Sequence, residues 1–169
     1  YYGTLSKKLY CKLNGYDFIV GDEIDYAKIE DAGEDYGWLK VYKLLECYFD
    51  YDYIFISDGD VSVMNFETKL EDIADQYFDD ETFMLITKDQ HDFNSGNILI
   101  KGKNQKFYDY ICKWKELLRT PFDEVAYYEQ PSLIHMIRHT DFGSVVKTID
   151  QSIMNSYCPH ANHSFSAEH

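Results

Sequence analysis

The chain has 169 residues, of which 30 are acidic and 16 basic, so its formal net charge at pH 7 is −14. This length predicts one domain, residues 1–169, which would bury about two-thirds of its unfolded surface. The acidic charge excludes nucleic acid and anionic membrane surfaces as favoured partners, because both select basic patches. With no apolar run of membrane-spanning length and no signal peptide in the sequence, we expect a soluble domain, with a cytoplasmic (reducing) compartment slightly favoured over a secretory lumen.

Two residue types stand out in the composition. There are 16 tyrosines and 11 phenylalanines, which suit sugar stacking and serve equally well as residues that reach from core to surface. The four cysteines are widely spaced and match no zinc pattern, so free thiols are expected, with two disulfides as the alternative. They are Cys11, Cys47, Cys112 and Cys158.

The first part of the chain predicts helices and strands in alternation. In order, these are a helix over residues 2–14, a strand over 17–22, an acidic surface loop over 23–37, a helix from residue 38, and a strand over 53–57. The first helix has leucines at intervals of four and ends at Gly15. The second has an apolar face of Leu39, Tyr42, Leu45 and Phe49.

The second part continues the alternation. It predicts a loop and helix over residues 65–77, strands over 83–87 and 97–101 with a polar turn over 89–96 between them, a helix from the cap Asn104 to Pro121, a helix over 129–138, and a strand over 145–149. This pattern predicts an α/β domain with a mixed, mostly parallel sheet flanked by helices. Because such a domain normally opens on a strand, we expect its first strand and C-terminal end to lie outside this sequence.

The strand over 53–57 ends in Asp58-Gly59-Asp60. In open α/β sheets, ligands bind at the carboxyl ends of the strands. Two carboxylates one residue apart provide the hard oxygen ligands that Mg²⁺ and Mn²⁺ prefer. A divalent cation site is therefore one prediction for this edge, and a plain surface turn is the alternative, because Asp-Gly is a common turn pair.

Three functions remain open for this pair. A haloacid dehalogenase-type phosphatase would use Asp58 as its nucleophile, although no later acidic pair follows a strand as that fold requires. A nucleotide-sugar glycosyltransferase would use a divalent cation to neutralise the diphosphate leaving group. A non-catalytic carbohydrate-binding domain would bind sugars without transferring them.

Four stretches, in order along most of the chain, resemble the galactosyl-, mannosyl- and xylosyltransferase family of fungi and plants. They are residues 10–22 with Asn-Gly-Tyr-Asp, residues 38–41 with Trp-Leu-Lys-Val, residues 53–65 with Asp-Gly-Asp, and residues 94–101 together with 129–133. The sequence is also compatible with small virus-encoded transferases of the same fold. The resemblance implies a nucleotide-sugar transferase of type A (Rossmann-like) fold, a UDP-linked sugar donor, a glycan acceptor and Mn²⁺ (or Mg²⁺).

The resemblance also implies roles for individual residues. Asp58 and Asp60 would bind the metal, and the donor would contact a set made up of Lys40, Asp58, Gly59, Asn94, Ser95 and Gly96. Two of these assignments have a plainer alternative. Lys40 could be a solvated helix lysine, and residues 94–96 could form a simple turn.

The expected catalytic residues are Asp92, Glu129 and Gln130. Asp92 is a loop carboxylate that could deprotonate an acceptor hydroxyl, and Glu129 and Gln130 begin a helix, where a plain capping role is the alternative. The family has Asp-Gln at the latter pair and a closing histidine segment that this sequence lacks. We therefore expect the third metal ligand beyond the sequence, and the stereochemical outcome stays open.

Overall fold

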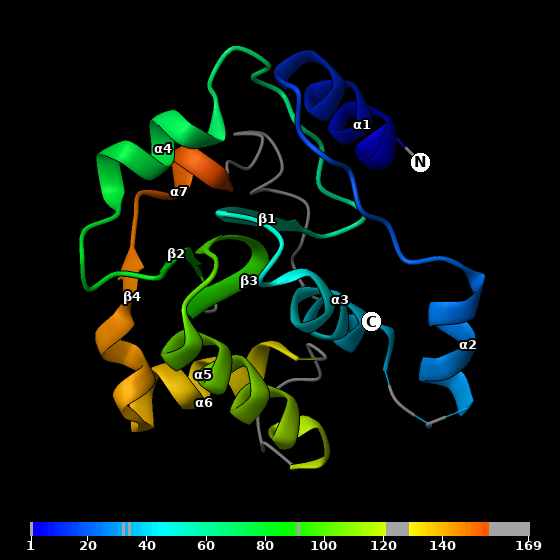
Figure 1. Cartoon of the computed structure of the whole chain (residues 1–169), viewed down its shortest axis with the longest axis vertical. Coiled ribbons are helices and arrows are strands. Elements are labelled where there is room, and N and C mark those ends of the chain that lie inside the picture. The colour runs from blue at the N-terminus through cyan, green and yellow to red at the C-terminus, as the bar shows by residue number, and fades with distance from the viewer. Residues whose placement is uncertain (1, 32, 34, 91, 121–128, 156–169) are drawn as a thin grey trace.

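The computed structural model describes residues 2–31, 33, 35–90, 92–120 and 129–155, which form a sheet covered by helices (Figure 1). The sheet has the strand order β1-β3-β2-β4. Its strands are β1 (Tyr53–Ser57), β2 (Met84–Asp89), β3 (Asp92–Lys101) and β4 (Val146–Thr148). β3 pairs antiparallel with β1 and β2, whereas β4 pairs parallel with β2. Three strands therefore point the same way around one reversed strand, which confirms a mixed α/β sheet.

Helices cover both faces of this sheet. They are α1 (Tyr2–Asn14), α2 (Glu23–Asp31), α3 (Leu39–Cys47), α4 (Leu70–Tyr77), α5 (Gln105–Glu116), α6 (Gln130–His139) and α7 (Gln151–Met154). α3, α5 and α6 pack on one face, and α4 and α7 pack on the other (Figure 1). Among the described residues, none of these helices is long and apolar enough to cross a membrane.

The alternation of side chains along β3 explains why two faces are covered. Ile98 and Ile100 pack against α3, α5 and α6, while Leu99 between them packs against α4 and α7. All three are completely buried. A strand that is buried on both faces reads as a continuous apolar run, as it does here. The sheet is therefore the rigid layer on which the ends of β1 and β3 are placed.

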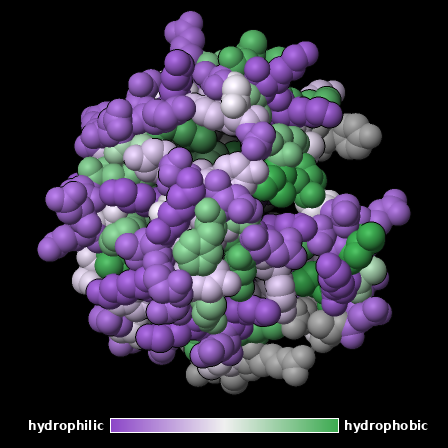
Figure 2. Space-filling view, in the orientation of Figure 1, coloured by the Kyte–Doolittle hydropathy of each residue, from purple (hydrophilic) through white to green (hydrophobic). Residues whose placement is uncertain are grey.

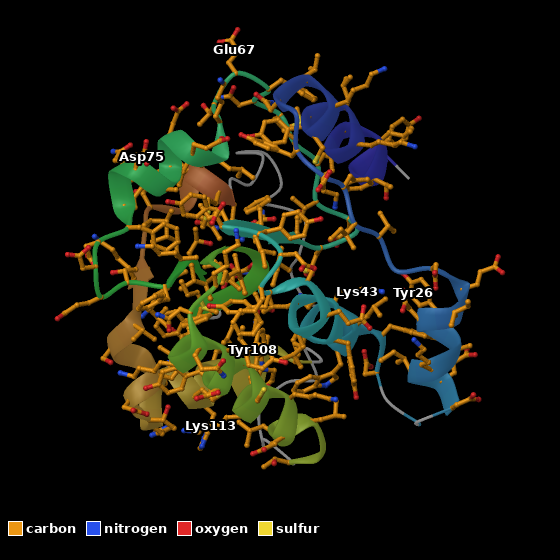
Figure 3. All side chains as sticks on the ribbon, viewed as in Figure 1. Tyr26, Lys43, Glu67, Asp75, Tyr108 and Lys113 are labelled. Carbon is orange, nitrogen blue, oxygen red and sulfur yellow. The ribbon has the colours of Figure 1, made fainter. Side chains whose placement is uncertain are left out.

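Two predictions for the segment before α3 are wrong. Residues 17–22 form no strand, and the predicted loop over 23–37 contains α2 and a 3₁₀ turn, Tyr36–Trp38. α2 begins where it does because the Asp22 carboxylate accepts hydrogen bonds from the amides of Ile24 (2.9 Å) and Asp25 (3.0 Å). The Lys43 ammonium, which extends from α3 (Figure 3), pairs with Asp25 at 2.7 Å.

The predicted turn over residues 89–96 is also shorter than expected. β3 begins at Asp92, which has a φ of 104°, and residues 94–96 lie within the strand. The pairing of β2 with β3 shifts register between Ile86 and Thr87. This bulge brings the polar residues 94–96 into the sheet beside the end of β1, where a turn would have projected them away from it.

The leucines of α1 face solvent. Leu5, Leu9 and Leu13 are 58%, 49% and 64% exposed, whereas Lys7 and Tyr10 on the other side are buried. Figure 2 shows hydrophobic side chains on the surface over α1. In α3, Val41 and Leu44 are buried; of the predicted face, Tyr42 and Leu45 pack against the core while partly buried, and Phe49 is exposed. The positions of α1 and α3 were predicted correctly, but in α1 the leucine spacing did not identify the face that packs inward.

The cysteines agree with the first expectation. Cys11, Cys47 and Cys112 are free thiols. Burial raises the pKa of the Cys11 and Cys47 thiols, which reduces their reactivity. Cys158 lies outside the described residues, as do Pro121 and the histidines near the C-terminus.

Candidate active site

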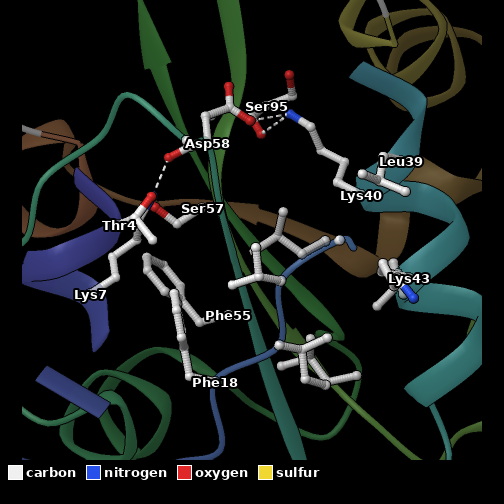
Figure 4. A pocket seen from close by; sticks show the side chains of 18 of the residues that line it. Thr4, Lys7, Phe18, Leu39, Lys40, Lys43, Phe55, Ser57, Asp58 and Ser95 are labelled. Carbon is white, nitrogen blue, oxygen red and sulfur yellow. Dashed lines mark hydrogen bonds and ion pairs between the residues drawn. The ribbon is translucent and has the colours of Figure 1, made fainter. Parts of the chain in front are cut away.

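A cavity of about 1720 Å³ runs along β1 and past its end. One wall is α1 and the segment after it, another is α3, and the polar end is formed by residues 58–60, 94–96 and 129–130. Figure 4 shows Lys7 and Lys40 reaching toward Asp58 from opposite walls, with Phe18 and Phe55 lining the apolar part. The cavity thus joins an aromatic compartment to a charged one, a combination suited to an amphipathic ligand.

Lys40 connects two carboxylates at the polar end. Its ammonium lies 2.5 Å from Oδ1 of Asp58 and 2.6 Å from Oε1 of Glu129, and it also donates to the carbonyl oxygen of Ser95 at 3.2 Å. Burial lowers the pKa of Lys40, but the charges of Glu129 and Asp58 outweigh it and leave that pKa above its usual value. Lys40 is therefore held as a cation, and it is not a solvated helix lysine.

The segment predicted to bind the donor, residues 94–96, meets the predicted catalytic pair Glu129 and Gln130 in space. The hydroxyl of Ser95 donates to Oε1 of Glu129 at 2.7 Å, and the amide of Ser95 donates to Oε1 of Gln130 at 2.9 Å. Ser95 and Glu129 are both almost fully buried. Burying the Glu129 carboxylate is tolerable because it is paired with a cation and a hydroxyl. The start of α6 is thereby joined to the bulged part of β3.

Gly96 allows the end of β1 to approach β3 closely. Its carbonyl oxygen accepts a hydrogen bond from the amide of Asp58 at 2.8 Å, and its own amide donates to Oδ1 of Asn94 at 2.8 Å. A Cβ at this position would lie 2.9 Å from that Asn94 oxygen and 3.3 Å from Oδ2 of Asp58. Asn94 in turn donates to Asp89 at 2.6 Å. Residues 94 and 96 thus shape the site through the backbone.

Asp92 is the predicted site residue that the structure does not bring to this place. Its carboxylate pairs with Arg138 of α6 and, at 3.5 Å, with Lys88. It is not among the described residues that line the cavity. The reason is its position as the first residue of β3, from which its side chain reaches toward α6. No observation tests its predicted role as a general base, and its place outside the cavity lining argues against that role.

Lys7 is a cavity residue that the sequence did not reveal. Its ammonium donates to the backbone carbonyl oxygen of Asp58, and its side chain is largely buried. Burial lowers the pKa of Lys7, against the charges of Asp58 and Asp60, which raise it. The local sequence carries no signal for this contact, because one lysine in a helix that also contains Lys8 and Lys12 reads as part of a solvated face.

The metal prediction can be compared with the residues present. Asp58 and Asp60 supply oxygen ligands of the right chemistry for Mg²⁺ or Mn²⁺, and Asp60 and Gly59 are exposed. However, no group of three or more His, Cys, Asp or Glu residues in the described part of the chain could hold a metal ion. Asp58 and Asp60 have the ligand atoms that the ion prefers, but two residues are fewer than the three of such a group, so metal binding by this pair stays a prediction.

The fold of the chain, but not its sequence, is similar to that of a known protein. No protein family model matches the sequence, and no curated protein matches it, so the resemblance to the fungal and plant family stays a prediction. Among solved structures, the fold is similar to that of a glycosyltransferase. The structure concerned is described as the crystal structure of a glycosyltransferase involved in the glycosylation of the major capsid of PBCV-1. It matches with a TM-score of 0.58 and 13% identity, over 88% of this chain and 73% of that chain.

Proposed function

We propose that this chain transfers a sugar from a nucleoside diphosphate sugar, with UDP as the nucleotide, to a carbohydrate acceptor. The observation that supports this best is the convergence of Asp58, Lys40 and Gln130 at one end of the cavity. They come from the end of β1, from α3 and from the start of α6, and they meet in a fold similar to that of a glycosyltransferase.

The leaving group of this reaction is a nucleoside diphosphate, whose departure requires its negative charge to be neutralised. A Mn²⁺ or Mg²⁺ ion bound by Asp58 and Asp60 would supply that charge. Lys40 provides a second cation from the chain itself. If Asp58 bound such an ion, Glu129, whose Oε1 lies 2.6 Å from the Lys40 ammonium, would hold Lys40 in place, and one hydrogen-bond direction of the ammonium would be available to a diphosphate oxygen.

The neighbouring polar groups would orient the donor sugar. Gln130 uses its carbonyl oxygen to accept from Ser95, which leaves its NH₂ group as a donor for a sugar hydroxyl. Glu129 orients Lys40 and Ser95 from a buried position. The Tyr and Phe side chains along β1, namely Tyr51, Tyr53 and Phe55, offer ring faces on which a base or sugar can stack.

A thermal-shift experiment with UDP tests this proposal. We expect UDP to raise the melting temperature only when Mn²⁺ or Mg²⁺ is present; at ~100 times its Kd the ligand adds about 2.7 kcal/mol to the free energy of unfolding. The shift should vanish in Asp60→Ala, whose exposed side chain makes little contribution to the fold. A shift that is independent of the metal, or one that Asp60→Ala keeps, would contradict the proposal.

A further inference from the structure

We propose that Lys7 is a positioning residue: from α1, its ammonium holds the backbone at Asp58 and so fixes the segment Asp58-Gly59-Asp60 at the polar end of the cavity before any ligand binds. What that segment then does rests on the function proposed above. The positioning itself rests on the contacts of α1 alone.

The backbone of Asp58 is held on both sides. On one side its amide donates to the carbonyl oxygen of Gly96 in β3 at 2.8 Å. On the other side its carbonyl oxygen accepts from the Lys7 ammonium and, within the turn, from the amide of Val61 at 3.2 Å. Strand β3 thus holds the amide of Asp58, and Lys7 holds its carbonyl oxygen. Without Lys7, the carbonyl oxygen of Asp58 would keep only the hydrogen bond from Val61 within the turn.

The same face of α1 holds the chain that follows. The hydroxyl of Ser6 accepts from the amide of Val63 at 3.0 Å, and the hydroxyl of Tyr10 donates to the carbonyl oxygen of Thr68 at 2.7 Å. Near the start of the helix, a Cβ on Gly3 would lie 2.6 Å from the carbonyl oxygen of Gly59 and 2.5 Å from that of Val61. α1 therefore contacts the backbone of residues 58–68 along most of its length.

The burial pattern of α1 supports a role in positioning over a role in the core. The helix buries Lys7 at 8% exposure, while Leu9, two residues further along and on the opposite side of the helix, is 49% exposed. Burying an ammonium is costly unless it is paired, whereas burying a leucine is favourable. The helix therefore turns toward residues 58–68 the face that can hydrogen-bond to them, although the burial of apolar side chains alone would favour the leucine face.

Lys7→Met tests this inference, because methionine keeps the length and apolar stem of the side chain but cannot donate. Amide hydrogen exchange at Val61 and Val63 should accelerate about ten-fold in this variant, while the amides of β3 stay unchanged. Lys8→Met, which alters an exposed lysine of the same helix, should exchange as the unaltered chain does. Lys7→Arg should restore slow exchange in part.

The kinetic readout separates positioning from general damage. With Mn²⁺ and a UDP-sugar, Lys7→Met should raise KM for the donor about ten-fold with a smaller change in kcat, because a looser site loses binding energy shared by ground and transition state. Unchanged exchange and unchanged KM would overturn the inference.

If the unaltered chain hydrolyses no donor, the proposed function fails, and the exchange comparison still decides about Lys7. Should Lys7→Met not fold, Gly3→Ala must loosen the same two amides, or the inference is wrong.

Discussion

The ammonium of Lys40 lies 2.6 Å from Oε1 of Glu129, a carboxylate whose side chain is only 2% exposed. No other cation forms an ion pair with Glu129 among the described residues. Lys40 on α3 and Glu129 at the start of α6 are distant in sequence, so this pair also joins two helices across the end of the sheet. Asp58, the other carboxylate that pairs with Lys40, has a side chain that is 39% exposed and is reachable from the cavity.

Lys40→Met should therefore destabilise the fold and weaken the donor site together. It would leave Glu129 buried without a cation, at a cost of about 3–5 kcal/mol in the free energy of unfolding. Lys103→Met is the matched control, because Lys103 pairs with Asp52 at the surface, at 2.9 Å. There the loss should be about 0–1 kcal/mol. Urea unfolding of both variants measures the difference.

The double variant Lys40→Met/Glu129→Gln separates the pair from its surroundings. It removes both charges, so most of the stability lost in Lys40→Met should return, while donor binding should stay weak. A single variant Lys40→Met as stable as the Lys103 control would show that the buried pair is unimportant.

Part of this arrangement could be predicted from the sequence. The apolar run before Asp58 identifies β1 and places the carboxylate at a sheet edge, because strand patterning is local. The family resemblance, and not local pattern, implied site roles for residues 94–96 and for Glu129 and Gln130, but their direct contact was not predicted. Which oxygen contacts which nitrogen depends on the bulge in β2–β3, a tertiary feature that no local spacing specifies.

The rest was not visible because it depends on competition between contacts. The acidic segment 23–37 has the sequence pattern of a loop, yet in the structure Asp22 caps α2 there and Lys43 pairs with Asp25. Lys7 looks like a surface residue until α1 packs with its polar face inward. The pair of Lys43 with Asp25 and the contact of Lys7 with Asp58 join residues far apart in the sequence, which charge or leucine spacing cannot report. The Asp22 cap, in contrast, is a local signal.

Gly96→Ala should disturb the position of the Asp58 carboxylate. The new Cβ would lie 2.9 Å from Asn94 Oδ1 and 3.3 Å from Asp58 Oδ2, so one of these groups must move. We expect a several-fold weaker effect of Mn²⁺ with UDP on the melting temperature. Gly59→Ala is the control, because no atom lies within 4 Å of its Cβ. Equal behaviour of the two variants would argue against a close fit at Gly96.

Asp92→Asn tests the one expected catalytic residue that lies apart from the others. Because Asp92 pairs with Arg138 and Lys88, we expect a modest loss of stability and a rate of sugar transfer close to that of the unaltered chain. Gln130→Ala, in contrast, should lower that rate at unchanged stability. Loss of transfer in a stable Asp92→Asn variant would instead identify Asp92 as the base.

Stability at low pH should depend on Asp79. Hydrogen bonds from Thr82 and the nearby ion pair with Lys147 hold the pKa of Asp79 at about 2, below its usual value. The ionised Asp79 carboxylate therefore stabilises the fold fully above the pKa that Asp79 has in the unfolded chain. This stabilisation is lost as the pH falls through about 2, the pKa of Asp79 in the folded chain. The melting temperature of Asp79→Asn should lie below that of the unaltered chain at about pH 6 and converge with it near pH 2. A difference that stays constant over this range would contradict the assignment.

The most direct measurement is a screen of nucleotide sugars for hydrolysis with Mn²⁺, in which NMR follows the anomer of the released sugar. We predict that a UDP-sugar is hydrolysed, that chelation of the metal stops the reaction, and that Asp60→Ala abolishes it at unchanged stability. The anomer first released would then decide between retention and inversion. Absence of hydrolysis with every donor, together with metal-dependent release of phosphate from a phosphomonoester that requires Asp58, would contradict sugar transfer and indicate a phosphatase.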